Sequence, residues 1–244
     1  MKVLGIIPAR YESSRFPGKP LIDLKGKTMV RRVYERASEC SLISKVVVAT
    51  DDQRIFDEVK SFGGEVMMTA DTHRNGTERC GEVVNALKEF EVVINIQGDE
   101  PLIHPKQLER IISVFDQNEV KIATIARKID NIEAIRNPNR VKVVMDKNQD
   151  ALYFSRSPIP HVAQKPHEDW LVSTSFYKHI GLYAWRRETL NELLKLSPTE
   201  LEKSESLEQL RWLENGYKIR CIISDLDTPN IDVPEDVKKV LDLL

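Results

Sequence analysis

The stretch KVLGIIPARYESSRFPGKPL, residues 2–21, joins a short apolar run to a charged loop. Residues 2–9 are almost continuously apolar, which is typical of a strand buried on both faces of a parallel sheet. Arg10, Arg15 and Lys19 follow within ten residues, and Glu12 is the only acidic residue among them. A buried strand that opens into a basic loop predicts an α/β sheet with an anion-binding segment after its first strand, although a solvated basic loop is the alternative.

Strand and helix patterns alternate through the next hundred residues. Apolar, β-branched runs predict strands at 45–50, 65–69 and 91–96, and amphipathic runs predict helices near 28–39, 52–62, 77–90 and 105–115. Further strands are expected at 120–126, 140–145, 151–154, 179–185 and 217–224, with helices at 187–196, at 206–215 and after Pro234. The pattern favours one domain over residues 1–244, with a Rossmann-like mixed, mostly parallel sheet.

Composition limits the possible partners of the chain. It has 244 residues, a net charge of −2, and no apolar run of membrane-spanning or signal-peptide length. We therefore expect no nucleic-acid partner and no membrane insertion. Three widely spaced cysteines, Cys40, Cys80 and Cys221, lack zinc-ligand spacing and predict buried thiols in a reducing cytoplasm.

Two further segments carry carboxylates at positions suited to chemistry. The sequence QGDEP, residues 97–101, ends a predicted strand, so Asp99 is placed to bind Mg²⁺ when phosphates supply the remaining ligands. An Asx turn before the next helix is an equally good interpretation. Asp232 precedes the terminal helix and is either free for such work or merely its cap. Neither a complete phosphate-binding loop nor a G-x-G-x-x-G pattern is present.

The second half of the chain contains a possible binding group. His179 and Tyr183 share one face of a predicted strand, and Arg156 follows another strand. Glu208 and Gln209 are adjacent on a predicted helix. A histidine or tyrosine on a strand is more often a packed core residue than a ligand-binding one, so the residues alone leave both possibilities open.

The motifs taken in order closely resemble the 3-deoxy-manno-octulosonate cytidylyltransferases, also called CMP-Kdo synthetases. They are IIPARYESSRFPGKPL (6–21), NGTER (75–79), QGDEP (97–101), SRSPIP (155–160), HIGLYAWRRETL (179–190) and ESLEQLRWLENGY (205–217). The opening motif is shared with other sugar-acid cytidylyltransferases, whereas the later ones narrow the match. The resemblance runs over nearly the whole chain.

The resemblance implies a nucleotide-diphospho-sugar transferase fold, a cytoplasmic homodimer and a role in lipopolysaccharide biosynthesis. The implied reaction joins CTP and Kdo to give CMP-Kdo and pyrophosphate, with Mg²⁺. Asp99 and Asp232 match the metal carboxylates. The nucleotide positions are Pro8, Ala9, Arg10, Arg15, Lys19, Asn75, Gly76, Thr77 and Gln97, with Arg15 and Lys19 also catalytic. The sugar-acid positions are Arg156, His179, Tyr183, Glu208 and Gln209. Asn75 departs from the pattern, since the family often has Ser there.

Three alternatives remain at this stage. A related enzyme would use another sugar acid, such as a sialic acid or a close Kdo analogue. A nucleotide-sensing protein would bind CTP without chemistry. A glycosyltransferase on the same scaffold would need a D-x-D motif after a strand, and Asp99-Glu100-Pro101 fits that motif poorly.

Overall fold

The computed structural model describes residues 1–12, 16–226 and 228–244, which form two compact units. Unit 1 comprises Met1–Ser113, Ala184–Leu194 and Thr228–Leu244, and unit 2 comprises Val114–Tyr183 and Lys195–Asp227. Each unit is assembled from segments that are distant in sequence. The fold class is confirmed as mixed, mostly parallel α/β, whereas a single domain over 1–244 stays a prediction.

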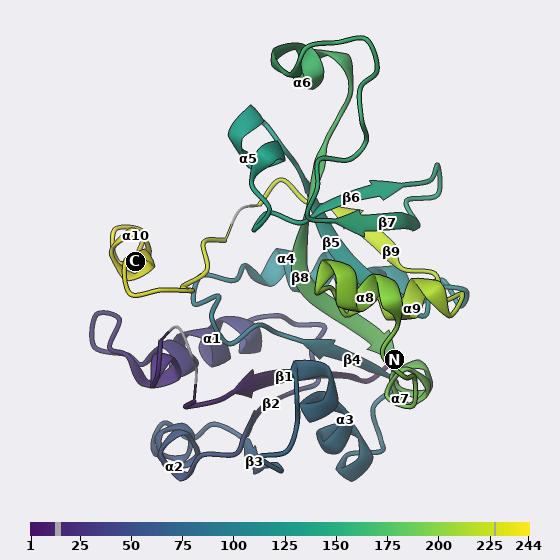
Figure 1. Cartoon of the computed structure of the whole chain (residues 1–244). Coiled ribbons are helices and arrows are strands. Elements are labelled where there is room, and N and C mark those ends of the chain that lie inside the picture. Colours follow the sequence, from purple (N-terminus) through teal and green to yellow (C-terminus); the bar gives the residue numbers. More distant parts are fainter. Residues whose placement is uncertain (13–15, 227) are drawn as a thin grey trace. The chain divides into compact units, whose positions relative to one another are not determined.

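Unit 1 is built on a parallel sheet in which β1 (Val3–Ala9) lies between β2 (Lys45–Thr50) and β4 (Val92–Asn95) (Figure 1). β3 (Val66–Met68) pairs with the outer side of β2, also in parallel. Ala9 is paired with Thr50 and Ile6 with Asn95, so these strands end at a common edge. Nearly every side chain of β1 and β2 is buried, as their continuous apolar sequences predict.

The helices of unit 1 begin where the sequence offers caps. Thr28 accepts the N–H of Arg31 before α1, and Asp52 accepts that of Arg54 before α2. Asn75 does the same for Glu78 at the start of α3. The helices are α1 (Met29–Ser38), α2 (Gln53–Ser61), α3 (Gly76–Ala86), α4 (Pro105–Ser113), α7 (Arg187–Leu193) and α10 (Asp236–Leu241), with a 3₁₀ turn at Lys19–Leu21.

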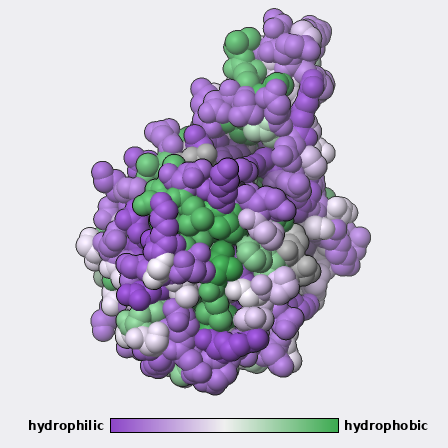
Figure 2. Space-filling view, turned by 90° about the vertical axis from the view of Figure 1, so that its left-hand side faces the viewer, coloured by the Kyte–Doolittle hydropathy of each residue, from purple (hydrophilic) through white to green (hydrophobic). Residues whose placement is uncertain are grey.

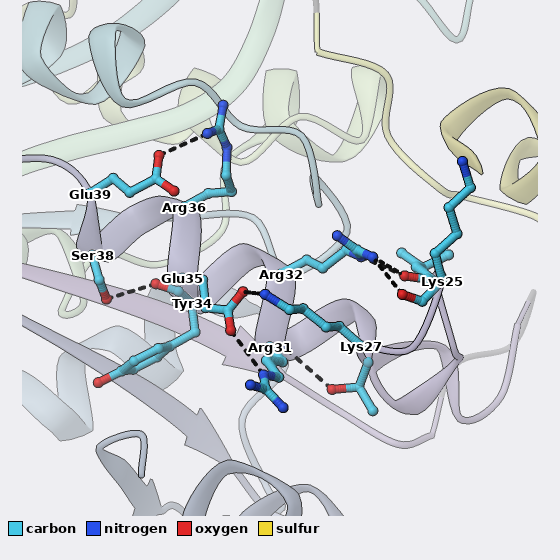
Figure 3. A network of polar contacts seen from close by, with 11 residues as sticks. Lys25, Lys27, Arg31, Arg32, Tyr34, Glu35, Arg36, Ser38 and Glu39 are labelled. Atoms are coloured by element: carbon cyan, nitrogen blue, oxygen red, sulfur yellow. Dashed lines mark hydrogen bonds and ion pairs between the residues drawn. The ribbon is translucent and has the colours of Figure 1, made fainter. Parts of the chain in front are cut away.

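The described parts of the segment after β1 are held in place by contacts within unit 1. Tyr11 lies 3.2 Å beneath the Arg54 guanidinium, and its carbonyl accepts the N–H of Gly18 at 2.9 Å. Gly18 has a φ of +71°, and a Cβ there would lie 3.2 Å from the Tyr11 ring. Farther on, Arg32 of α1 donates to the carbonyls of Leu24 and Lys25 (Figure 3). The turn that carries Lys19 is therefore held by ordinary packing within unit 1.

Glu35 links the end of this segment to α1. Lys27 donates to one of its carboxylate oxygens at 2.6 Å and Arg31 to the other at 2.9 Å (Figure 3). Burial acts to raise the pKa of Glu35, but the hydrogen bonds from Lys27 and Arg31 outweigh it and the pKa is lowered. These partly exposed pairs add little stability individually, but they link the loop to the helix.

Unit 2 mixes parallel and antiparallel pairing. β5 (Ile122–Lys128) pairs in parallel with β9 (Arg220–Ile223), and β6 (Lys142–Met145) pairs antiparallel with β7 (Ala151–Ser155) and β8 (Tyr177–Arg186), whose last residues belong to unit 1. The helices are α5 (Ile132–Arg136), α6 (Trp170–Ser173), α8 (Glu200–Glu205) and α9 (Gln209–Glu214), with 3₁₀ turns at Val114–Asp116 and His167–Asp169.

One expectation for unit 2 needs correction. The helix expected at 206–215 begins only at Gln209, because Ser206 adopts the left-handed conformation (φ +53°) and ends α8. The stretch 158–177, for which the sequence predicted no helix, contains a 3₁₀ turn and α6, and its Trp170 stacks on Phe176 in a local apolar cluster with Ile129 and Ile135. Its two short helical turns are too brief to show a helical period in sequence.

The surface and the cysteines follow the composition. Figure 2 shows a mostly hydrophilic face with hydrophobic side chains gathered near its middle. Cys40, Cys80 and Cys221 are buried thiols outside any disulfide, as predicted, and burial raises the pKa of Cys221 to about 12. No helix in the described part of the chain combines the length and hydropathy needed to span a bilayer.

Candidate active site

The carboxyl edge of the unit 1 sheet brings together the segments that the sequence singled out there. A Cβ on Gly98 would lie 2.8 Å from the carbonyl oxygen of Pro8, so the end of β1 and the loop after β4 are in close contact. A Cβ on Gly76 would lie 3.5 Å from Pro8 Cγ and 3.3 Å from Asn95 Nδ2. The predicted base-binding residues Pro8 and Gly76 therefore lie side by side.

Asn75 caps a helix at this edge of the sheet. Its side-chain oxygen accepts the N–H of Glu78 at 2.9 Å and so caps α3. Asn and Ser are among the best N-capping residues, which explains how Asn can stand where the family often has Ser. Thr77 is buried in the first turn of the same helix, and Ala9 is buried at the end of β1. Asn75 thus fixes the backbone of the predicted base-binding segment.

Lys19 joins three segments that are far apart in sequence. Its Nζ donates to Asp99 Oδ2 at 2.9 Å and to the carbonyl oxygen of Ile231 at 2.8 Å. The main-chain N–H of Ile231 in turn donates to the carbonyl of Asp99 at 2.9 Å. Asp99 and the residue before Asp232 are therefore hydrogen-bonded neighbours. The two predicted metal carboxylates come from segments that meet, as a shared cation would require.

Asp232 is not the cap of the terminal helix. Glu235 occupies that position, and Asp236 accepts the main-chain N–H groups of Asp232 and Val233. The Asp232 carboxylate instead accepts Asn230 Nδ2 at 2.8 Å. Among the described residues no cluster of three or more His, Cys, Asp or Glu side chains could hold a metal ion. The donor set fits Mg²⁺ only as a site with few protein ligands, completed by phosphate oxygens and water.

Arg10 lies near a buried ion pair between Arg79 and Asp51 that the sequence did not reveal. Arg79 has no exposed surface and donates to Asp51 Oδ2 at 2.5 Å and to the hydroxyl of Thr69. The same Asp51 oxygen lies 4.0 Å from Arg10 Nε. Arg10 Nη2 is buried and has no hydrogen-bond partner among the described residues. A buried guanidinium nitrogen of this kind suits an anionic ligand.

Two further residues, Gln97 and Arg15, were predicted to bind the nucleotide. Gln97 is half-buried in the loop after β4, and its carbonyl accepts the N–H of Glu100 at 3.3 Å. Arg15 lies outside the described residues.

In unit 2, His179 and Tyr183 form part of an aromatic cluster. Their ring centroids are 5.3 Å apart, which confirms that they share one face of β8. Tyr183 packs edge-on against Trp212 at 5.0 Å, and His179 against Phe154 at 5.0 Å. This packing desolvates the His179 ring and lowers its pKa to about 3, so the ring is neutral at physiological pH.

Glu208 and Gln209 stand at the start of α9. Glu208 is its N-cap residue and already has helical backbone angles (φ −55°, ψ −38°). Burial raises the pKa of Tyr183, the charges of Cys221 and Glu208 add to that, and a hydrogen bond with Thr124 opposes it. Gln209 is only 5% exposed, and its Nε2 has no hydrogen-bond partner in the described chain. A buried donor of this kind points to a polar ligand.

Arg156 is held by backbone carbonyls. Its Nε donates to the carbonyl of Glu205 at 2.7 Å, and its two terminal nitrogens to those of Pro138 and Ser206 at 3.1 and 3.4 Å. The Glu205 carboxylate accepts the main-chain N–H of Arg156 at 2.9 Å. Arg156 therefore shapes the turn that leads into α9, and two of its five N–H groups remain for a ligand.

Sequence reasoning missed four residues that orient the predicted ones, namely Asp51, Arg79, Thr124 and Trp212. Asp51 lay in the polar segment after the second strand, so its place on the rim was visible, but its partner was not. Arg79 looked like an ordinary helix arginine, because sequence does not show that a charged side chain is buried. Only the fold reveals that Thr124 of β5 contacts His179.

Comparisons with known proteins agree along the whole chain. A family model for cytidylyltransferases matches residues 4–219. A 3-deoxy-manno-octulosonate cytidylyltransferase of Parabacteroides distasonis is 52% identical over 249 residues, covering 100% of this chain and 98% of the relative. One of Bacteroides thetaiotaomicron is 50% identical over 248 residues, with the same two coverages.

Solved structures show the same likeness. A CMP:2-keto-3-deoxy-manno-octonic acid synthetase complexed with CTP matches with a TM-score of 0.94 at 41% identity, covering 100% of this chain and 98% of that one. A glucose-1-phosphate thymidylyltransferase of Bacillus anthracis matches with a TM-score of 0.68 at 15% identity, over 99% and 94% of the two chains. The latter likeness shows the fold alone.

Proposed function

Because the chain belongs to the 3-deoxy-manno-octulosonate cytidylyltransferase family, we propose that it transfers CMP from CTP to the anomeric hydroxyl of Kdo and releases pyrophosphate. The observation that carries the proposal is the contact of Lys19 with Asp99 and with the carbonyl next to Asp232. It gathers a cation and two carboxylate-bearing segments at the edge of the sheet where ligands of α/β folds bind.

The residues of unit 1 act on the nucleotide. Pro8, Ala9 and the segment Asn75–Thr77 hold the base, while Arg10, Arg15 and Lys19 bind the triphosphate and Gln97 contacts the nucleotide. The Kdo hydroxyl oxygen forms a bond to the α-phosphorus as the bond to the β-phosphate oxygen breaks, and the hydroxyl proton passes to water. Arg15 and Lys19 stabilise the charge that develops on the leaving pyrophosphate.

Mg²⁺ fits the carboxylates of Asp99 and Asp232, and when bound it supplies charge neutralisation and orients the attacking hydroxyl. In this scheme Lys19 neutralises Asp99 in the nucleotide-free protein, where its Nζ lies 2.9 Å from Asp99 Oδ2. Mg²⁺ held by Asp99 and Asp232 would compete with Lys19 for the Asp99 carboxylate, and Lys19 would then be available to bind phosphate.

The residues of unit 2 act on the sugar acid. Gln209 offers a buried amide donor, and Tyr183 and His179 offer a phenol and a neutral imidazole from one face of β8. Arg156 and Glu208 stand at the turn before α9 and at its first residue. Such a set of donors and acceptors suits a polyhydroxylated carboxylic acid.

The experiment measures pyrophosphate release from CTP with and without Kdo and Mg²⁺. We expect release only when all three are present, with EDTA abolishing it and with ATP, GTP and UTP as poor substitutes. CTP binding without pyrophosphate release would instead identify a nucleotide-sensing protein. A panel of sialic acid and Kdo analogues shows whether another sugar acid is preferred.

The family also supports three properties that we include in the proposal. The protein is a homodimer, resides in the cytoplasm and supplies activated Kdo for lipopolysaccharide biosynthesis. Light scattering on the purified protein tests the first, cell fractionation the second, and loss of lipopolysaccharide on depletion the third.

A further inference from the structure

Thr124 places a fully buried hydroxyl among polar atoms of β8, including the phenol of Tyr183. Its Oγ1 lies 2.8 Å from the carbonyl oxygen of Leu182 and 3.2 Å from that of Ile180. The third contact is to Nε2 of His179, at 3.0 Å. All these residues belong to unit 2, and His179 and Tyr183 are the two among them that were predicted from sequence to contact the sugar acid.

The hydroxyl has one proton, and this decides the tautomer of His179. The two carbonyl oxygens can only accept, so the proton of Thr124 is directed at them. If the hydroxyl donated to His179 instead, its oxygen would face two carbonyl oxygens with no proton between them. The Thr124 oxygen must therefore accept, and Nε2 of His179 must carry a hydrogen and donate.

The remaining ring nitrogen, Nδ1, is then an acceptor. The packing around the ring lowers the pKa of His179 to about 3, so Nδ1 keeps its lone pair at physiological pH. No hydrogen bond to Nδ1 is found in the described part of the chain. Gly181 lies between His179 and Tyr183 on the same face, and a Cβ there would meet no atom within 4 Å. The strand thus leaves room beside the imidazole for a ligand.

We propose that Thr124 is a positioning residue that fixes His179 as its Nε2–H tautomer, so that Nδ1 accepts a hydrogen bond from a hydroxyl of the sugar acid. A neutral acceptor repels a carboxylate, so His179 selects the hydroxylated part of the substrate and not its acid group. The choice of a sugar acid as ligand rests on the proposed function, whereas the tautomer does not.

The tautomer is tested by NMR of protein labelled with ¹⁵N-histidine. The chain has 5 histidines, and the His179→Gln variant identifies the signals of His179. We expect the wild type to show a protonated Nε2 and an unprotonated Nδ1, and Kdo to perturb Nδ1. Thr124→Val removes the acceptor at similar volume and should yield a mixture of tautomers, while Thr124→Ser should retain the wild-type pattern. A protonated Nδ1 in the wild type would overturn the proposal, whether or not the variants fold.

Kinetics test the consequence for the substrate. Loss of one oriented hydrogen bond should raise the KM for Kdo about tenfold in Thr124→Val and leave the KM for CTP unchanged. Thr124→Ser should restore the wild-type KM. Equal changes for both substrates would show a merely structural role. If Kdo is not a substrate at all, the proposed function fails, and the NMR result on wild type still decides the role of Thr124.

Discussion

At the scale of single residues, Asp51 was not predicted to matter from sequence, yet it lies beside Arg10, a predicted nucleotide-binding residue. It neutralises the buried Arg79 at 2.5 Å and lies 4.0 Å from Arg10. Breaking a buried ion pair by removing one partner costs about 3–5 kcal/mol, because the other charge is left buried and unpaired. Asp51 therefore contributes both to folding and to the orientation of Arg10.

We expect Asp51→Asn to lower the free energy of unfolding by about 3 kcal/mol and to raise the KM for CTP, since both guanidinium groups lose their counter-charge. Asp52→Asn is the matched control. Asp52 caps α2 and pairs with the exposed Arg54, and Asn is an equally good cap, so its cost should be below about 1 kcal/mol. Chemical denaturation of both variants provides the measurement. Equal stabilities would show that the Asp51–Arg79 pair is unimportant.

The carboxylates of the proposed metal site allow a second test. Asp99→Asn and Asp232→Asn keep the side-chain volume but remove the charge, so each should abolish pyrophosphate release while leaving the melting temperature within a few degrees of wild type. Near-normal turnover of CTP by either variant would remove that residue from the metal site. Circular dichroism confirms that each variant is folded.

At this scale the sequence predicted residue types and approximate positions. Lys19 and Asp99 were predicted in loops that follow strands, and Asp232 just before the terminal helix. The structure brings the three segments into hydrogen-bonding contact. The orientation of Arg10 by Asp51 could not be predicted, since burial of Arg79 depends on packing among β2, β3 and α3. The sequence also could not show that backbone carbonyls hold the Arg156 guanidinium in place.

At the scale of elements, the short loop after β4 depends on Gly98. A Cβ at this position would lie 2.8 Å from the backbone carbonyl oxygen of Pro8, an atom that cannot move without shifting β1. Gly98 thus allows β4 to end close against β1 and to place Asp99 beside Lys19. The sequence showed the glycine, but not the atom that requires it.

We expect Gly98→Ala to destabilise the protein by about 1–3 kcal/mol and to reduce kcat more than any other kinetic parameter, because the loop that carries Asp99 must shift. Gly181→Ala is the stability control, since a Cβ there meets no atom within 4 Å. Thermal unfolding and pyrophosphate release are measured on both. A Gly98→Ala protein with wild-type stability would mean that the contact with Pro8 is easily relieved.

Long apolar strands and capped helices were the elements that sequence predicted well. The strands at 45–50 and 91–96 and the helix capped by Thr28 agree closely with β2, β4 and α1. The short helices α5, α6 and α8 were missed, because four to six residues are too few to establish a helical period. Their stability comes from tertiary packing, as Trp170 on Phe176 illustrates.

At the scale of the whole molecule, the net charge of −2 conceals local charges of both signs. Cations of the opening segment are offset by Asp99 and Asp51 within unit 1. The composition predicted the absence of a global field, whereas the fold was needed to show how the local charges balance.

Acid stability of the whole molecule provides the last test. His179 has an ordinary pKa of 6.5 that is lowered to about 3 in the folded protein by desolvation. Below pH 6.5 the unfolded chain binds a proton at this residue and the folded protein does not, so stability is present above pH 6.5 and is lost as the pH falls toward 3.

The free energy of unfolding should fall by about 1 kcal/mol per pH unit through this range from this residue alone. His179→Gln should show a smaller loss by that amount. Urea titrations at several pH values measure the difference, and parallel curves for wild type and His179→Gln would show that the His179 ring is hydrated in the folded protein, because a hydrated ring would bind its proton equally well in both states.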